Sequence, residues 1–486
     1  MMTGAILNPV NSSIIAVALA PIGAALGADA SETAWLISAL YLATSIGQPL
    51  AGRLVDMYGP RRLFLAGAAL TGIAGVLGTL APNLGVLVAA RVILGFGTCA
   101  GYPAAMYLIR SEADRTGMKS PAGVLTALAV ATQTIAVVGP TLGGLLIGVG
   151  GWRSTFAVNI PLAIACLVLG LLFLPAHLPA QAAPAETAPA QAAPARTPGV
   201  PARTPGTPAR TPGAPARTPG APPARARIDA VGILLFAATL VSLLLFLMDT
   251  RLDRVWLLAV TVLAGAGFAL RELRATDPFI DVRVFAGNVP LLATYARTLA
   301  GYTVSYAFIY GFTQWLEDGR GLSASAAGLV LLPTFAVGIV VSALTGGRAA
   351  VLGKLVVGAA VQLAACALLL VLGDHTAVWI LVTVTALLGL PQGLISLANQ
   401  NALYHQADPA RMGASSGLLR TFMYLGAMVS SSATGAFFGR RATTEGLHGL
   451  AVFMLAAAAV LLVLTVADRS LAVPAARETA GAGRAS

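Results

Sequence analysis

The sequence predicts an all-α integral membrane protein with 14 transmembrane helices, arranged as two six-helix bundles with an inserted helix pair. Of the 486 residues, 57% are hydrophobic and only 10% are charged, whereas soluble globular proteins have about 25% charged residues. The chain divides into apolar runs of the length that a bilayer requires, ~20 residues. The basic residues fall mainly in alternate connections between these runs, as the connections of membrane proteins do.

Fourteen apolar runs are long enough to cross a bilayer. They cover residues 4–27, 33–55, 63–81, 84–109, 122–149, 154–175, 230–248, 255–271, 288–315, 323–346, 352–373, 377–398, 412–438 and 447–467. The first run has no basic segment before it, so we expect it to be the first span and not a cleaved signal peptide.

The distribution of Lys and Arg predicts the orientation. With the N-terminus in the cytoplasm, 21 of the 30 basic residues fall in cytoplasmic segments, six fall outside and three lie within helices. Cytoplasmic loops of membrane proteins carry this excess. We therefore expect a multi-pass protein of the cell (plasma) membrane with both termini in the cytoplasm.

Residues 176–228 differ in composition from the rest of the chain. Four seven-residue repeats, each reading A-R-T-P-G-x-P, follow one another over residues 195–222. Dense proline prevents a helix, and nothing in the segment could form a core. We predict a disordered cytoplasmic linker, which is either a plain spacer or a segment whose arginines bind anionic lipid. The predicted divisions are an N-terminal six-helix bundle at 1–175, the linker at 176–228, an inserted helix pair with its connecting loop at 229–287, a C-terminal six-helix bundle at 288–470 and a cytoplasmic tail at 471–486.

A short segment after the second apolar run combines turn glycines with charged residues. The residues concerned are Gly52, Asp56, Gly59, Arg61 and Arg62. Glycine at a tight turn lets two helices approach closely. The carboxylate of Asp56 could pair with Arg61 or Arg62, or it could face a helix N-terminus. We predict that this segment is a conformational latch; the alternative is a plain solvated turn.

This segment resembles motif A of the major facilitator superfamily, and further motifs follow in order. The fourth run contains Leu87, Arg91, Leu94, Gly95 and Gly97, which resemble motif B; the fifth contains Gly139, Pro140, Gly143 and Gly144, which resemble motif C; and Trp152, Arg153, Phe156, Asn159 and Pro161 follow as in the fourteen-helix drug:proton antiporters. The resemblance implies an exporter built of two bundles. The sequence departs from the family pattern at Asn11, where an aspartate is usual, and at Met57 and Pro60, where motif A usually has basic residues.

The motif C residues make a small, proline-interrupted helix face. A proline removes one helical hydrogen bond, and small residues allow neighbouring helices to pack closely and pivot. Gly139, Pro140, Gly143 and Gly144 are therefore predicted to govern leak and direction of transport; the alternative is a kink that only serves packing.

Three arginines, Arg91, Arg297 and Arg420, lie within apolar runs, and none of the 19 acidic residues lies in a helix centre. A charge at mid-membrane is costly and usually faces a cavity or a partner. Neutral or anionic amphiphiles are therefore the predicted substrates, with Arg297 and Arg91 as the expected contacts. The alternative for each arginine is structural hydrogen bonding. For a proton carrier, only Glu317 and Asp318 at an outer helix end remain, and a solvated pair is the alternative.

Polar and aromatic side chains predict a central cavity. Tyr302, Tyr306 and Tyr310 recur at helical spacing, which could also be interhelical packing. The cavity candidates are Asn8, Asn11, Arg91, Gln133, Arg297, Tyr306, Tyr310, Gln314, Gln392 and Arg420.

The sequence thus favours a secondary transporter that exports drugs or amphiphilic metabolites by alternating access, with protons as the expected coupling ion. The alternatives are uptake or exchange of a small anionic or neutral solute, and a non-transporting receptor on the same fold. The sequence has no metal-ligand cluster, P-loop or nucleophile elbow, so we expect no enzyme, metal or cofactor. The expected partners are a small-molecule substrate and the lipid bilayer; we expect no nucleic acid, and a monomer.

Overall fold

The computed structural model describes residues 2–28, 30–33, 35–116, 122–175, 229–248, 252–275, 279–280, 288–322, 324–346, 350–438 and 442–472. Every regular element in these ranges is helical, and they contain no strand. The predicted linker and most of the predicted C-terminal tail lie outside the described residues.

The N-terminal half contains the helices up to residue 173. They are α1 (Met2–Ile14), η1 (Ile15–Val17), α2 (Leu19–Leu26), α3 (Ala30–Thr33), α4 (Trp35–Tyr58), α5 (Pro60–Thr79), α6 (Leu84–Thr98), α7 (Gly101–Thr116), α8 (Ala122–Gly150), α9 (Ser154–Ala157) and α10 (Asn159–Phe173).

The remaining helices form a pair and a C-terminal half. The pair is α11 (Ala230–Met248) and α12 (Val255–Arg274), joined through η2 (Leu252–Arg254); the half consists of α14 (Val289–Ala307), η3 (Phe308–Phe312), η4 (Trp315–Gly319), α15 (Ala324–Thr345), α16 (Val351–Leu369), α17 (Val378–Gln406), η5 (Pro409–Arg411), α18 (Met412–Phe438), α19 (Thr444–Ala467) and η6 (Arg469–Ala472).

Local sequence explains several helix ends. The side-chain oxygens of Asn83, Asn288 and Thr443 each accept a hydrogen bond from a backbone N–H in the first turn of the helix that follows, at 3.0–3.1 Å. Such N-caps satisfy amides that have no partner within the helix. Between α4 and α5, Gly59 has a φ of +86° and Pro60 occupies the first helical position. This sharp turn lets the two helices run antiparallel.

Two transmembrane paths are interrupted. Pro21 in α2 has no N–H to donate to the carbonyl of Val17, four residues earlier, and the 3₁₀ segment η1 ends at that residue. Beyond α14, the segments η3 and η4 are π-helical. Such segments are rare and often occur at functional sites because they displace side chains from the regular helical positions.

The surface of the protein is apolar and its interior contains polar groups, the reverse of a soluble protein. Leu172, Phe173 and Val371 are each more than 70% exposed, whereas Arg91 and Arg297 are almost fully buried. Among the described residues, eight helical segments are long and apolar enough to cross a membrane: Pro60–Thr79, Leu84–Thr116, Ser154–Phe173, Val255–Arg274, Ala326–Thr345, Val351–Leu369, Val378–Gln406 and Thr444–Ala467. The predicted all-helical membrane fold is confirmed.

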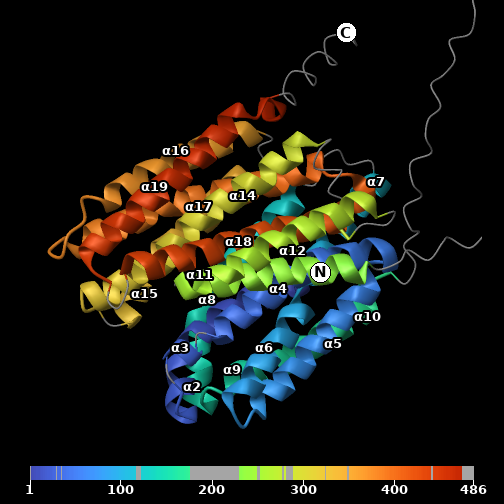
Figure 1. Cartoon of the computed structure of the whole chain (residues 1–486), viewed down its shortest axis with the longest axis horizontal. Helices are drawn as coiled ribbons and strands as arrows, with labels where there is room; N and C mark the ends of the chain where they lie inside the picture. Colours follow the sequence, from blue (N-terminus) through green and yellow to red (C-terminus); the bar gives the residue numbers. More distant parts are fainter. Residues whose placement is uncertain are drawn as a thin grey trace, which may run out of the picture.

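Figure 1 shows the two halves side by side, with the N-terminal helices in blue to cyan and the C-terminal helices in yellow to red. The halves meet mainly where α18 packs against α4 and α7 and where α8 packs against α15 and α17. The green pair α11 and α12 lies across the middle of this view, and α11 contacts both α4 and α18. The pair is held together at one end by Asp229, which accepts hydrogen bonds from the amide of Gly232 and from Arg271.

Candidate functional site

The carboxylate of Asp56 joins the two halves. It lies near the end of α4 and accepts hydrogen bonds from the backbone amides of Gly413 at 2.9 Å and Ala414 at 2.8 Å, in the first turn of α18. The first amides of a helix lack internal partners and carry the positive end of its dipole, so they bind a carboxylate well. The sequence left Arg61, Arg62 or a helix N-terminus as the partner of Asp56. In the structure, the partner is the N-terminus of α18. We call this end of the molecule the latch end.

Glycines allow the backbones of α4 and α18 to touch beside Asp56. A Cβ atom on Gly52 would lie 2.7 Å from the carbonyl carbon of Gly413, and one on Gly417 would lie 2.9 Å from the carbonyl carbon of Gln48. One turn further, the hydroxyl of Thr421 donates to the carbonyl oxygen of Ser45 at 3.1 Å. The two halves are thus interlocked by backbone contacts that no larger residue could make.

The other residues of the predicted latch lie beside this contact and do not join it. Gly59 forms the turn between α4 and α5, and Arg62 is exposed. The guanidinium of Arg61 donates to the carbonyl oxygen of Leu171 in α10 at 3.1 Å, within the N-terminal half. The contact between the halves therefore depends on the carboxylate and the glycines.

The predicted motif C face packs against the first helix. A Cβ atom on Gly139 would overlap the side chain of Ser13, and one on Gly143 would lie 3.0 Å from the carbonyl oxygen of Ile14, whereas one on Gly144 would meet nothing within 4 Å. The close approach of α8 to α1 is therefore made by two of the three glycines. The side chain of Pro140 is outside the described part of the chain.

Asn8 lies at the centre of a polar network between the halves. Its amide nitrogen donates to the hydroxyls of Thr44 and Thr98, at 3.3 and 2.9 Å, and its oxygen accepts from the hydroxyl of Tyr424 in α18 at 2.7 Å. Tyr424 also packs against the ring of Tyr41 in α4.

Asn11 and Arg91 hold the helices of the N-terminal half together. The side-chain amides of Asn11 and Asn159 form a reciprocal pair, with N···O distances of 2.7 and 2.9 Å. Arg91 donates to the carbonyl oxygens of Leu36 at 2.9 Å and of Asn11 at 3.2 Å. Arg91 therefore makes structural hydrogen bonds, which the sequence left open as the alternative to a contact with substrate.

Arg297 forms an ion pair, which corrects the prediction of three arginines without a carboxylate. Its Nη1 lies 2.6 Å from Oδ2 of Asp468, just beyond α19, and its Nη2 donates to the hydroxyl of Thr294. Burial raises the pKa of Asp468, but hydrogen bonds from Ser470 and the charge of Arg297 outweigh it and hold the pKa below its usual value. The sequence pattern missed this partner because Asp468 follows the last apolar run.

The tyrosine stripe continues across the interior. The rings of Tyr302 and Tyr306 are 5.9 Å apart and those of Tyr306 and Tyr310 are 5.6 Å apart and stacked. The hydroxyl of Tyr310 lies 2.9 Å from that of Tyr41 in the other half. All three tyrosines of the stripe are half-buried.

Two of the remaining cavity candidates do not join this interior group. Gln314 is exposed and Gln392 is half-buried, and neither lines the pocket described next. The side chain of Gln133 lies outside the described residues. Glu317 and Asp318 lie in η4, half-buried and exposed respectively, at the end of α14 opposite to Asn288.

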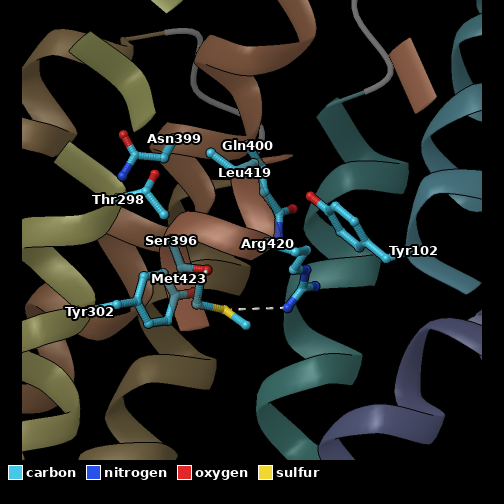
Figure 2. Close-up of a pocket in the computed structure, with 9 residues that line it drawn as sticks. All are labelled: Tyr102, Thr298, Tyr302, Ser396, Asn399, Gln400, Leu419, Arg420 and Met423. Carbon is cyan, nitrogen blue, oxygen red and sulfur yellow. Dashed lines mark hydrogen bonds between the residues drawn. The ribbon is translucent and has the colours of Figure 1, made fainter. Parts of the chain in front are cut away.

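A pocket surrounds Arg420. Figure 2 shows the Arg420 side chain between Tyr102 of α7 on one side and Met423 on the other, with Tyr302 and Asn399 across the pocket. The full lining is Tyr102, Thr298, Tyr302, Ser396, Asn399, Gln400, Leu419, Arg420 and Met423, around a cavity of about 20 Å³. Drug-sized ligands occupy pockets of ~300–1,000 Å³, whereas a cavity of this size has room for one small polar group. In the described part of the chain, no three metal-ligating side chains come together.

Two interlocked helical halves with an apolar exterior and a polar interior indicate a multi-pass membrane protein. A family model for the Major Facilitator Superfamily matches residues 1–431. The chain therefore belongs to the Major Facilitator Superfamily, and it is a multi-pass membrane transporter and not an enzyme.

Individual proteins agree with this assignment. The chain is 30% identical to the uncharacterized MFS-type transporter YwoD of Bacillus subtilis, over 96% of this chain and 94% of that protein. It is 26% identical to the tetracenomycin C resistance and export protein of Streptomyces glaucescens, over 90% of this chain and 74% of that protein. The structure is similar to that of the human organic anion transporter MFSD10, with a TM-score of 0.61 and 14% identity over 95% of this chain and 97% of that one. That similarity confirms the fold.

Proposed function

We propose that the protein is a secondary exporter of drugs or amphiphilic metabolites, which crosses the cell membrane as a monomer with 14 helices and works by alternating access. The observation that carries the proposal is the contact between the Asp56 carboxylate and the first amides of α18. A contact of this kind, made across the two halves by few groups, is one that a rocking motion can break and remake.

The proposed orientation has the latch end in the cytoplasm. Arg61, Arg62, Arg110, Arg115 and Arg411 all belong to helix ends or turns on this side of the bundle, and cytoplasmic segments are enriched in such residues. With this orientation, the interlocked helices α4 and α18 close the cytoplasmic side. The conformation is then the one in which an exporter releases substrate to the outside.

Proton exchange is proposed to act at Asp56. Protonation would remove the negative charge that the N-terminus of α18 stabilises and would weaken both hydrogen bonds, because bonds to a charged group are stronger than bonds to a neutral one. The latch would open when Asp56 is protonated and close when the proton leaves. Export is supported by the close glycine packing of α8 on α1 and by the relative whose name describes a resistance and export protein.

The test is efflux into inside-out vesicles, measured over a range of pH with a panel of amphiphilic compounds. Asp56→Asn should lower the rate of efflux by about tenfold or more. Each oxygen of the Asp56 carboxylate accepts a hydrogen bond from one backbone amide of α18, and the NH₂ group that replaces one oxygen in asparagine cannot accept. Asp56→Glu should retain part of the rate. Asp114→Asn is a matched control, because the exposed Asp114 pairs with Arg110 within α7 and makes no other ion pair in the described part of the chain.

Normal insertion of Asp56→Asn, checked by expression and thermal unfolding, separates loss of mechanism from loss of fold. Unchanged efflux in this variant would remove Asp56 from the mechanism. Failure of the wild-type protein to move any compound in either direction would favour the receptor, and concentration of an anionic or neutral solute on the cytoplasmic side would favour uptake.

A further inference from the structure

Arg420 is a buried cation without a counter-ion. Arg420 is 7% exposed, and it makes no ion pair among the described residues. In the part of the chain that the structure describes, its Nη1 donates only to the sulfur of Met423, at 3.6 Å, and its Nη2 is buried without a hydrogen-bond partner. The guanidinium carbon lies 3.9 Å from the centre of the Tyr102 ring. A buried charge is costly unless it is paired, and the ring supplies only a weak substitute.

The other two buried arginines are engaged with the protein itself. Arg297 has the carboxylate of Asp468, and Arg91 has two backbone carbonyl oxygens, although Nε of Arg297 and Nη2 of Arg91 are also buried without a hydrogen-bond partner among the described residues. Arg420 differs from both because it has neither a carboxylate nor a carbonyl oxygen as a partner in the described part of the chain, and because it lines the pocket.

Further unpartnered polar groups face the same pocket. Both amide atoms of Asn399, the side-chain oxygen of Gln400 and the hydroxyl of Tyr102 are buried and lack a hydrogen-bond partner among the described residues. Buried polar groups are normally paired, so a cluster of them beside one cation indicates an external partner. The guanidinium, the Tyr102 hydroxyl and the Asn399 NH₂ group donate to anionic oxygens, while the two amide oxygens accept from a hydroxyl on the same ligand.

An aromatic surface begins at the pocket. Tyr302 belongs both to the lining and to the stripe that continues through Tyr306 to Tyr310. The rings of Tyr306 and Tyr310 are only 18° from parallel. Stacked, half-buried rings of this kind favour a flat aromatic partner. The pocket alone is too small for a drug-sized molecule, so the stripe would hold the part of a ligand that extends from it.

We propose that this site selects an aromatic acid: the carboxylate, or an equivalent anionic oxygen group, binds Arg420 and Tyr102, and the flat ring system lies along Tyr302, Tyr306 and Tyr310. This rests on the proposed function, because it names the substrate class among the amphiphiles that the protein exports. It assigns the anion contact to Arg420 and leaves Arg91 and Arg297 as structural residues.

The experiment measures equilibrium binding by fluorescence to the full chain in lipid nanodiscs. Three probes share one ring system and differ in charge: 9-anthracenecarboxylate, 9-anthracenemethanol and 9-(aminomethyl)anthracene. The proteins are wild type, Arg420→Gln and the matched control Arg320→Gln. Arg320 also stacks on an aromatic ring, that of Trp315 at 5.7 Å, but it donates to the carbonyl oxygen of Gly373 and lies outside the pocket.

We expect wild type to bind the carboxylate most tightly and the amine most weakly. Arg420→Gln should weaken binding of the carboxylate by about tenfold or more and change that of the alcohol by less than about twofold, as expected for loss of a charge-assisted contact. Arg320→Gln should change neither. Tyr306→Leu should weaken all three probes by similar factors, because it removes the stacking surface and leaves the charge in place.

The proposal is overturned if the amine binds wild type best, if Arg420→Gln weakens all three probes equally, or if it weakens none. Should Arg420→Gln not fold, Arg420→Lys replaces it: this variant keeps the charge but loses the planar fork, and only the carboxylate should bind more weakly. Binding needs no transport. Selective binding without efflux would therefore refute the proposed function and leave this site intact. Efflux without charge-selective binding would refute this site and leave the proposed function intact.

Discussion

A single methyl group at Gly417 would test whether the close contact of α4 and α18 at Gly52 and Gly417, which we call the seam, sets the conformation of the protein. In Gly417→Ala, the new Cβ atom would lie 2.9 Å from the carbonyl carbon of Gln48 and closer still to its oxygen. Ordinary van der Waals contact begins at 3.4 Å. Both neighbours are backbone atoms of a helix, which cannot rotate aside as a side chain could. The helices would have to separate by about half an ångström or more.

The expected cost falls on the closed conformation alone, because the open conformation does not contain the seam. Overpacking of this kind costs about 1–3 kcal/mol, which is roughly a 5- to 150-fold change in a conformational equilibrium. The separation would also pull the first turn of α18 away from the Asp56 carboxylate. We therefore expect the latch end to open in a large fraction of molecules.

The assay is the distance between spin labels on exposed cysteines introduced at Arg62 and His405, at the latch end of the two halves. The three native cysteines are buried, which limits background labelling. Gly417→Ala should add a population at longer distance. Gly435→Ala is the matched control, since it lies on the same helix and its Cβ atom would meet nothing within 4 Å. A distance distribution identical to wild type in Gly417→Ala would refute the reasoning.

Three further predictions follow from other contacts. Because the pKa of Asp468 is held below its usual value, its pair with Arg297 adds stability above the ordinary aspartate pKa and loses it as the pH falls through the lowered value. The thermal unfolding temperature of Asp468→Asn should thus lie below that of wild type at pH 7, and the gap should close as the pH falls through the lowered pKa of Asp468; a gap independent of pH would contradict the pairing. Asn11→Ala leaves Asn159 without its reciprocal partner and should cost about 1–3 kcal/mol of stability, seen as a lower unfolding temperature; an unaltered temperature would show that the pair is dispensable. Deleting three of the four linker repeats should leave efflux near the wild-type rate, whereas a clear loss would favour a lipid-binding role.

The sequence alone was sufficient for the fold class. Composition and apolar runs predict a helical membrane protein because every backbone group in a bilayer must be satisfied within its own segment. The family followed from short motifs whose residues are needed by local geometry, such as the glycines at the turn beside Asp56. These features are local or repeat along the chain, so they can be read without knowing which helices touch.

The partners of the buried polar residues required the tertiary structure. In the sequence, Arg91, Arg297 and Arg420 all lie in apolar runs and cannot be told apart. In the structure, Arg91 binds backbone carbonyl oxygens, Arg297 pairs with a carboxylate, and Arg420 lines a pocket without a counter-ion among the described residues. The choice depends on Asp468 and Tyr102, which are far from Arg297 and Arg420 in sequence.

The same holds for Asp56. Its neighbours Arg61 and Arg62 were the obvious partners in the sequence, yet the carboxylate binds the start of a helix more than 350 residues later. Hydrophobicity fixes which segments are buried, because it acts on each segment separately. Hydrogen bonds and ion pairs are short-ranged and directional, so their partners are decided only when the two halves pack together.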